Sequence, residues 1–161
     1  MRQIMTMTAV SVALFGAALL ATPGDGYLFN VVVNRATAAK PLRVIGGEHG
    51  WFVSLATTRP ADFVVQDVAL APAGYTGWHS HPGSVQITVK TGTATYYDAS
   101  GGRCRQVVYP TGSAFVEPPN VVHALQNEGD EDLELVNTYI VPVGVPTRTE
   151  EDNPGTCPGV R

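Results

Sequence analysis

The sequence predicts an all-β domain built from short strands, arranged as a sandwich or a barrel. Turn-forming residues are frequent, with 17 Gly and 12 Pro in 161 residues. From residue 41 onward the apolar runs are short and rich in Val, Thr and Tyr, and no amphipathic helix or internal repeat is visible. Short strands at this spacing, with nothing helical between them, are typical of sandwiches and barrels.

Each expected strand is bounded by turn residues. In chain order they are 42–45 and 51–56 on either side of GGEHG, 62–71 before PAG, 84–91 before Gly92, 93–98 before ASGG, 103–109 before PTG, 113–117 before PPN, 121–127 before EGDED, and 133–141. The clearest pattern is that of 84–91 (SVQITVKT), where apolar and polar residues alternate. This alternation is typical of a half-buried strand.

Length and composition indicate one globular domain, because 44% of the residues are hydrophobic and only 15% are charged. A net charge of −4 with few Lys and Arg leaves no basic face for nucleic acid and no polybasic patch for a membrane surface. We expect three regions. Residues 1–38 are a signal peptide or signal anchor with a linker, 41–142 form the barrel, and 143–161 are a Pro- and Gly-rich tail.

The N-terminus has the pattern of a secretory signal. Arg2 precedes the apolar run 9–21 (AVSVALFGAALLA), which ends in small residues. An uncleaved signal anchor is the alternative, because the run approaches spanning length when it is counted from Ile4. Cleavage could follow Ala21 or, by the small-x-small rule, Ala38, and the apolar run between these points has no assignment. The domain is expected to be secreted or otherwise extracytoplasmic, or held at the membrane by the anchor.

The two cysteines fit an oxidising compartment. Cys104 lies in an expected strand and Cys157 in the tail. A disulfide between them would attach the tail to the barrel, whereas the alternative is two unpaired thiols. No CxxC spacing indicates a metal–thiolate site.

Histidines supply the strongest chemical signal. His79 and His81 stand at i and i+2 in residues with a strand pattern, so their side chains point to the same face. His123 lies in a later strand between Val121 and Leu125. An inward-facing histidine needs a hydrogen bond or a metal to offset its burial. Two imidazoles on one face make half of a divalent-metal site, and His123 is a candidate for the other half.

These histidines lie in two stretches that resemble the motifs of the cupin family. The family's second motif, G(X)5PXG(X)2H(X)3N, matches Gly112, Pro118, His123 and Asn127, with Asn120 in place of the second Gly. Asn tolerates the left-handed backbone conformation that such a turn requires.

The first motif, G(X)5HXH(X)3–4E(X)6G, matches His79, His81 and Gly92, and Gly74 is one residue out of register. The resemblance covers about residues 62–141. It implies a double-stranded β-helix, the small jelly-roll barrel, with a metal at the histidines.

One position departs from the family pattern. Val85 stands where the resemblance places a metal-binding Glu, and Gln86 occupies the longer permitted spacing. We therefore prefer a metal site made of His79, His81 and His123. The second choice adds Gln86 to these three ligands, and the third is a barrel that binds no metal. Imidazole suits Fe, Zn and Ni, whereas the loss of an oxygen ligand disfavours Mn and Mg.

The resemblance implies two functions. One is a metal-dependent enzyme acting on a small molecule, such as an oxygenase. The other is a non-catalytic module that holds a small ligand in the barrel. Neither implies a nucleic-acid partner, and a homodimer is the oligomer common in the family.

Several other residues could lie at the site or elsewhere in the fold. Glu117 is either an acid or base at the barrel mouth or a solvated strand-end residue. Trp78 should face away from the histidines and pack. His49 is expected to be exposed. Asn127 is expected to form hydrogen bonds, within a turn or to a metal-binding residue, rather than to bind a metal itself. Three tyrosines either line the cavity or fill the core: Tyr96, Tyr97 and Tyr139.

Overall fold

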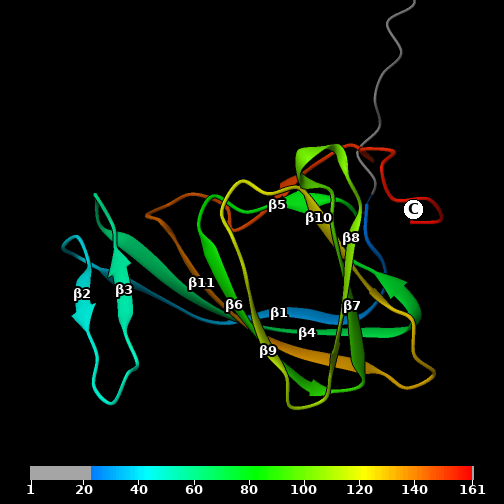
Figure 1. Ribbon diagram of the computed structural model, residues 1–161, viewed down its shortest axis with the longest axis horizontal. Helices are drawn as coiled ribbons and strands as arrows, with labels where there is room; N and C mark the ends of the chain where they lie inside the picture. Colours follow the sequence, from blue (N-terminus) through cyan, green and yellow to red (C-terminus); the bar gives the residue numbers. More distant parts are fainter. Residues whose placement is uncertain (1–22, 161) are drawn as a thin grey trace, which may run out of the picture.

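The computed structural model describes residues 23–160, and Figure 1 shows an all-β molecule with one short 3-10 turn at Ser100–Gly102. Among these residues no helix is long and apolar enough to cross a membrane. The apolar run 9–21 lies outside the described residues. The strands are β1 (Asp25–Ala38), β2 (Arg43–Gly46), β3 (Val53–Ala56), β4 (Ala61–Tyr75), β5 (His79–Ser80), β6 (Ser84–Thr91), β7 (Thr93–Asp98), β8 (Arg105–Pro110), β9 (Ala114–Glu117), β10 (His123–Asn127), β11 (Leu133–Pro142) and β12 (Thr149–Glu150).

One ten-stranded sheet forms a nearly closed jelly-roll barrel. Its neighbours run in the order β12-β5-β10-β4-β11-β6-β9, with β1 beside β4 and with β7 beside β10 and β8. Consecutive neighbours on this path are far apart in sequence, so the segments that carry the two histidine motifs meet in space. The predicted all-β barrel is confirmed.

The barrel interior is filled from alternate positions of the long strands. Inward side chains such as Val64, Leu70, Val85 and Leu133 are fully buried in one apolar core. A second cluster lies outside the barrel wall, where Trp78 packs with residues of the chain's C-terminal end. The expectation that Trp78 packs rather than faces the histidines is confirmed.

Strand β1 has no counterpart among the expected strands. It pairs with β4 along nearly its whole length, from Asp25 opposite Tyr75 to Ala38 opposite Ala61. Residues 25–38 thus form sheet rather than a linker, because their extended backbone completes the hydrogen bonding of β4. Cleavage after Ala38 would remove this strand. The domain boundaries and the cleavage site stay predictions.

Asp62, in β4, links β1 and the turn that follows β11. Its carboxylate accepts hydrogen bonds from Thr37 Oγ1 at 2.6 Å, Arg35 Nη1 at 2.9 Å and the backbone N–H of Gly144 at 3.2 Å. The hydrogen bond from Thr37 is the largest of the effects that lower the pKa of Asp62, and the other two partners act in the same direction.

We expect acid to weaken the fold partly through this carboxylate. Because the folded pKa lies below the unfolded one, the stabilisation is complete above about pH 4 and is lost as the pH falls through the folded pKa. Asp62→Asn should lower the free energy of unfolding at neutral pH and flatten its decline in acid. Denaturant unfolding between pH 2 and 7 measures both, and parallel pH profiles for the two proteins would contradict the assignment.

Residues 143–160 form a segment that we call the C-terminal strap. Its strand β12 pairs with β5, with Glu150 opposite His79. A disulfide joins Cys157 to Cys104, which is the first of the two alternatives considered for these cysteines, and Cys104 stands just before β8 rather than inside a strand. The tail is thus fixed against the barrel over the strand that carries the histidines.

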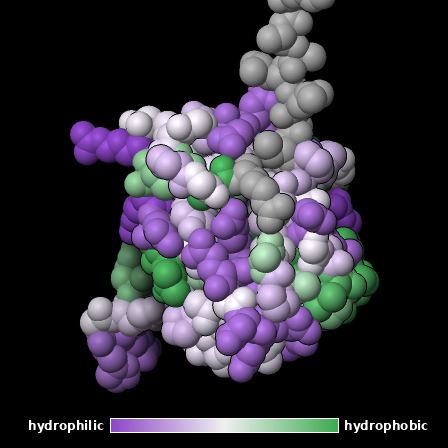
Figure 2. All heavy atoms as spheres, turned by 90° about the vertical axis from the view of Figure 1, so that its right-hand side faces the viewer, coloured by the Kyte–Doolittle hydropathy of each residue, from purple (hydrophilic) through white to green (hydrophobic). Residues whose placement is uncertain are grey.

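Residues 43–56, strands β2 and β3 with their turn, project from the barrel at the left of Figure 1 and are called the arm. His49 at its turn is 91% exposed, so its predicted separation from the other histidines is confirmed. On the side of the molecule opposite the arm, hydrophilic side chains predominate, and hydrophobic ones gather towards the margins (Figure 2).

Candidate metal centre

His79 lies in β5 and His81 follows directly, and both side chains point into the barrel. They are 4% and 2% exposed, and their ring centroids lie 4.8 Å apart. The i and i+2 spacing in an extended segment places both rings on the inner side, as the sequence predicted.

His123 begins β10, which pairs with β5 so that His123 stands directly opposite His79. Their ring centroids are 4.3 Å apart, and His123 is fully buried. Asn120, in the turn before it, has φ of 59°, and its backbone N–H donates to His81 O at 2.8 Å. This turn, for which the motif uses Gly, therefore ties the second histidine stretch to the first.

The three imidazoles are held in the same way. Each Nδ1 lies at hydrogen-bond distance from a backbone carbonyl: His79 from Gly77 O at 2.8 Å, His81 from Thr147 O at 2.6 Å, and His123 from Val121 O at 2.8 Å. A carbonyl accepts only from an N–H, so Nδ1 of each ring carries a proton and Nε2 is the nitrogen that faces the centre. This backbone support is what metal-binding histidines receive in proteins.

Glu117 completes the group. It is 3% exposed, and its carboxylate oxygens lie 3.1 Å from His81 Nε2 and 3.3 Å from His123 Nε2. The interpretation as a solvated strand-end residue is wrong. We call His79, His81, Glu117 and His123 the histidine–carboxylate centre, and their ligand atoms all lie within 4.8 Å of one another.

The register of the sheet explains how Glu117 arrives there. On β6, Val85 is inward and fully buried, and its direct partner on β9 is Glu117. The carboxylate expected at Val85 is thus supplied by the neighbouring strand at the same level of the barrel. No sequence signal revealed this inward direction, because the outward position of the strand is also apolar: Val116, between the buried Phe115 and Glu117, is 60% exposed.

Gln86 is not brought to the centre. It stands between the inward Val85 and Ile87 on β6, so its side chain leaves from the other face. Its amide donates to Ser84 Oγ at 3.0 Å. No bulge changes the pairing of β6 with β9 at this point, so the register shift that would bring Gln86 inward is not seen.

Burial and mutual charge shift the pKa values of Glu117, His79 and His123 in different directions. Burial is the largest single effect on the pKa of Glu117 and raises it, but the charges and hydrogen bonds of His123 and His81 together outweigh burial and keep that pKa well below its usual range. Burial lowers the pKa of His79 well below 6.5, and His123 lowers it further. For His123, burial is the largest single effect and lowers the pKa, but the charge and hydrogen bond of Glu117, with the backbone hydrogen bond to Val121, together leave the pKa raised. Metal binding at this centre would therefore displace a proton from His123.

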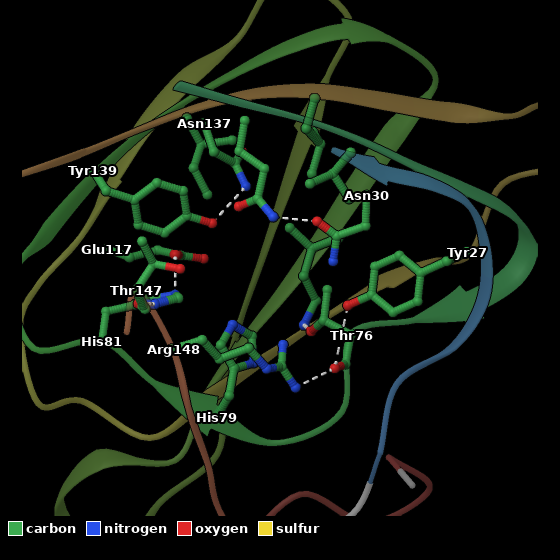
Figure 3. A pocket seen from close by; sticks show the side chains of 15 residues that line it. Tyr27, Asn30, Thr76, His79, His81, Glu117, Asn137, Tyr139, Thr147 and Arg148 are labelled. Carbon is green, nitrogen blue, oxygen red and sulfur yellow. Dashed lines mark hydrogen bonds and ion pairs between the residues drawn. The ribbon is translucent and has the colours of Figure 1, made fainter. Parts of the chain in front are cut away.

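A cavity of about 70 Å³ adjoins the centre, and Figure 3 shows the polar side chains around it. His81 and Glu117 lie on one wall beside Tyr139, whose ring centroid is 5.4 Å from that of His81. Burial raises the pKa of the Tyr139 hydroxyl, so it keeps its proton, and it accepts a hydrogen bond from Asn137 Nδ2 at 3.2 Å. A space of this size holds only a few water molecules or a small organic molecule.

The C-terminal strap supplies the cation of the cavity. Arg148 lines it, donates to Thr76 O at 2.6 Å, and forms an ion pair with the exposed Glu150, with Nε 2.5 Å from Oε1. The Pro- and Gly-rich composition of the tail gave no indication of this contact.

The tyrosines and Asn127 considered in the sequence lie in different parts of the structure. Tyr97 packs beside Trp78 in the outer cluster, and Tyr96 lies in the main core, with its ring centroid 5.3 Å from that of His123. Of the three tyrosines considered, only Tyr139 lines the cavity. Asn127 donates to Leu70 O and Glu131 O and accepts from Gly129 N–H. The prediction that it forms hydrogen bonds within a turn is confirmed.

Comparisons with known proteins agree with this architecture. A family model described as "Cupin domain" matches residues 66–139. Peruvianin-I, a cysteine peptidase from Thevetia peruviana latex, superposes with a TM-score of 0.50 at 16% identity over 56% of each chain. Bacillus subtilis oxalate decarboxylase, a protein with Mn(II) centres, gives a TM-score of 0.50 at 22% identity over 55% of this chain and 23% of its own.

An oxalate oxidase bound to glycolate gives a TM-score of 0.44 at 26% identity, over 48% of this chain and 41% of its own. The match thus spans little more than half of peruvianin-I and about a quarter of the decarboxylase. At these identities the likeness concerns the fold. No functionally curated protein matches the sequence.

Proposed function

We propose that this chain, whose residues 66–139 match a cupin-domain family model, is a metal-binding protein acting on a small molecule. The histidine–carboxylate centre would hold a divalent transition metal, and the adjoining cavity would hold the substrate. The observation that carries the proposal is the convergence of four buried ligand groups within 4.8 Å, with every imidazole Nδ1 tied to a backbone carbonyl.

The presence of Glu117 widens the range of metals that the centre could bind, relative to three histidines alone. Three imidazoles suit Fe, Zn and Ni, and Glu117 adds the hard oxygen ligand whose absence disfavoured Mn. A divalent ion with one carboxylate retains a net positive charge, and four protein ligands leave coordination positions open in an octahedral ion. Oxygen-rich or anionic small molecules are therefore the favoured class of substrate.

An oxygenase or related redox enzyme is the reaction type that this centre supports best, because a redox-active metal would supply the oxidising chemistry. The protein's own groups would orient the substrate: Arg148 offers positive charge, and Tyr139 offers a protonated hydroxyl beside His81. The cysteine-peptidase activity of peruvianin-I is not supported here, since both cysteines form the disulfide. A non-catalytic ligand-binding module is the alternative, and oxygen uptake with candidate substrates separates the two.

Metal analysis of the purified, reconstituted chain tests the centre. We expect about one equivalent of transition metal in the native protein and less than about a tenth in His123→Ala, because loss of one ligand opens the buried set. His49→Ala is the matched control, since His49 is 91% exposed on the arm. Absence of metal from all three proteins, or retention by His123→Ala, would refute the proposal.

We also propose that the domain works outside the cytoplasm. The disulfide is compatible with an oxidising compartment outside the cytoplasm. The N-terminal apolar run that would direct export lies outside the described residues.

A further inference from the structure

The inward positions of β11 are apolar except at two neighbouring places. Burial alternates along this strand, and its inward residues in chain order are Leu133, Leu135, Asn137, Tyr139 and Val141. Asn137 is 7% exposed and Tyr139 is 5% exposed. A buried polar side chain is costly unless its groups are hydrogen-bonded, and leucine or valine would fill such positions without that cost. Two polar side chains thus stand next to each other in an otherwise apolar row.

Both side chains line the cavity beside the histidine–carboxylate centre. Figure 3 shows them reaching into it from β11, with Glu117 and His81 next to the Tyr139 ring. The ring centroids of Tyr139 and His81 are 5.4 Å apart. A chemical group held by Asn137 and Tyr139 would therefore belong to the same small molecule that reaches the metal ligands.

The hydrogen-bonding capacity of this pair is only partly used. Asn137 Nδ2 donates to Tyr139 Oη at 3.2 Å. Asn137 Oδ1 is buried and has no hydrogen-bond partner among the residues that the structure describes. Burial raises the pKa of Tyr139, so the phenol keeps its proton and can donate it. One acceptor and one donor are therefore available at adjacent points of the cavity wall.

We propose that Asn137 and Tyr139 form a subsite for a hydroxyl group, and that the substrate is a small hydroxylated acid. The inference rests on the proposed function, in which the centre would bind the acid group. A hydroxyl both donates and accepts, so it can donate to Asn137 Oδ1 while it accepts the Tyr139 proton. For the same reason it fits the pair in either orientation of the Asn137 amide. A methyl group in its place would leave both protein groups unpaired.

A purely structural role explains the pair less well. A buried acceptor without a partner destabilises a fold, and an apolar side chain of the same shape would remove that cost. Residues that break such a rule are expected where they serve a function. The neighbouring polar side chains do not supply the missing bond: Gln66, directly opposite Asn137 on β4, donates its amide to Asn30.

Two matched acids test the preference for a hydroxyl. Propionate and β-hydroxypropionate have the same carboxylate and differ in one hydroxyl. The full chain, loaded with the transition metal found in the native protein, is titrated calorimetrically with each acid. We expect β-hydroxypropionate to bind at least about tenfold more tightly, because a site built for a hydroxyl rejects an analogue that lacks it.

Two substitutions each remove one half of the subsite while they nearly keep the side-chain shape. Asn137→Leu and Tyr139→Phe should each reduce the preference to about threefold or less, and the double variant should show none. The affinity for propionate should change by less than about twofold, since propionate makes neither hydrogen bond. Thr138→Val is the matched control, because Thr138 lies between the two residues on the other face of β11, and it should keep the full preference.

Denaturant unfolding of the ligand-free proteins gives a readout that does not depend on the metal. Asn137→Leu/Tyr139→Phe should be at least as stable as the native protein, because both polar partners are replaced by apolar groups of similar shape. A double variant that is less stable and still prefers β-hydroxypropionate would show that the pair is structural, and this result would overturn the inference.

Equal affinity of the metal-loaded native protein for the two acids would also overturn it. The metal content of the same samples separates this failure from a failure of the proposed function. A protein that takes up no metal contradicts the proposed function. The subsite is then tested by the thermal stabilisation that each acid gives the metal-free protein, and equal stabilisation by both acids would overturn the inference as well.

Discussion

Replacing Glu117 with valine is expected to weaken metal binding by at least about 100-fold. Loss of an outer hydrogen-bonding partner of a metal ligand already costs 10–100-fold, and Glu117 stands among the ligand groups themselves. The substitution also removes the negative charge that opposes the cation and leaves three neutral donors. We further expect Val85→Glu, added to Glu117→Val, to recover most of the lost affinity.

The recovery is expected because the two positions are equivalent in the barrel. Val85 and Glu117 are direct cross-strand partners, and both side chains are buried. Side chains directly opposite in an antiparallel pair have Cβ atoms only about 5 Å apart. Exchanging the residues keeps the number of buried carboxylates and the buried volume unchanged, whereas Val85→Glu alone would bury two carboxylates side by side.

Isothermal titration with the metal found in the native protein measures these affinities. Glu131→Val, which removes an exposed carboxylate in the loop before β11, is the control and should bind as the native protein does. Unchanged binding by Glu117→Val would show that the carboxylate is not a ligand. Failure of the exchanged protein, when it is folded, would show that only β9 presents a carboxylate correctly.

The strands whose side chains alternate could be predicted from sequence. Strands β6 and β7 have the expected bounds, because alternating residues and the Gly92 turn define both ends locally. The inward aim of His79 and His81 follows from the same rule. Their meeting with His123 could be expected only from the resemblance, because the pairing of β5 with β10 joins segments far apart in the chain.

Features that depend on which strand lies beside another could not be predicted. Glu117 ends its strand next to prolines, and only its pairing with Val85 shows that it points inward. Strand β1 has an apolar run without alternation, which resembles the end of a leader, and its role depends on the exposed edge of β4. The C-terminal strap has little secondary structure, so its composition says nothing about where it lies.

Loss of the disulfide is expected to have the second large effect. Cys104 and Cys157 are 53 residues apart, and closing a loop of that length stabilises the fold by about 4 kcal/mol in the chain-entropy model. Cys104→Ser/Cys157→Ser should therefore lower the free energy of unfolding by roughly this amount. Denaturant unfolding measures the change, and the native protein treated with a reductant should show the same loss.

The same pair of substitutions should also weaken metal binding, because the C-terminal strap orients a ligand. His81 Nδ1 lies 2.6 Å from Thr147 O, and the strap contacts β5 again where Ser80 Oγ donates to Glu151 Oε1 at 2.7 Å. Releasing the end of the strap frees the carbonyl that fixes the His81 ring, and we expect about a tenfold loss of affinity. Titration of the folded double variant measures it. A protein that loses stability but keeps its full affinity would show that the strap holds the fold together without positioning His81.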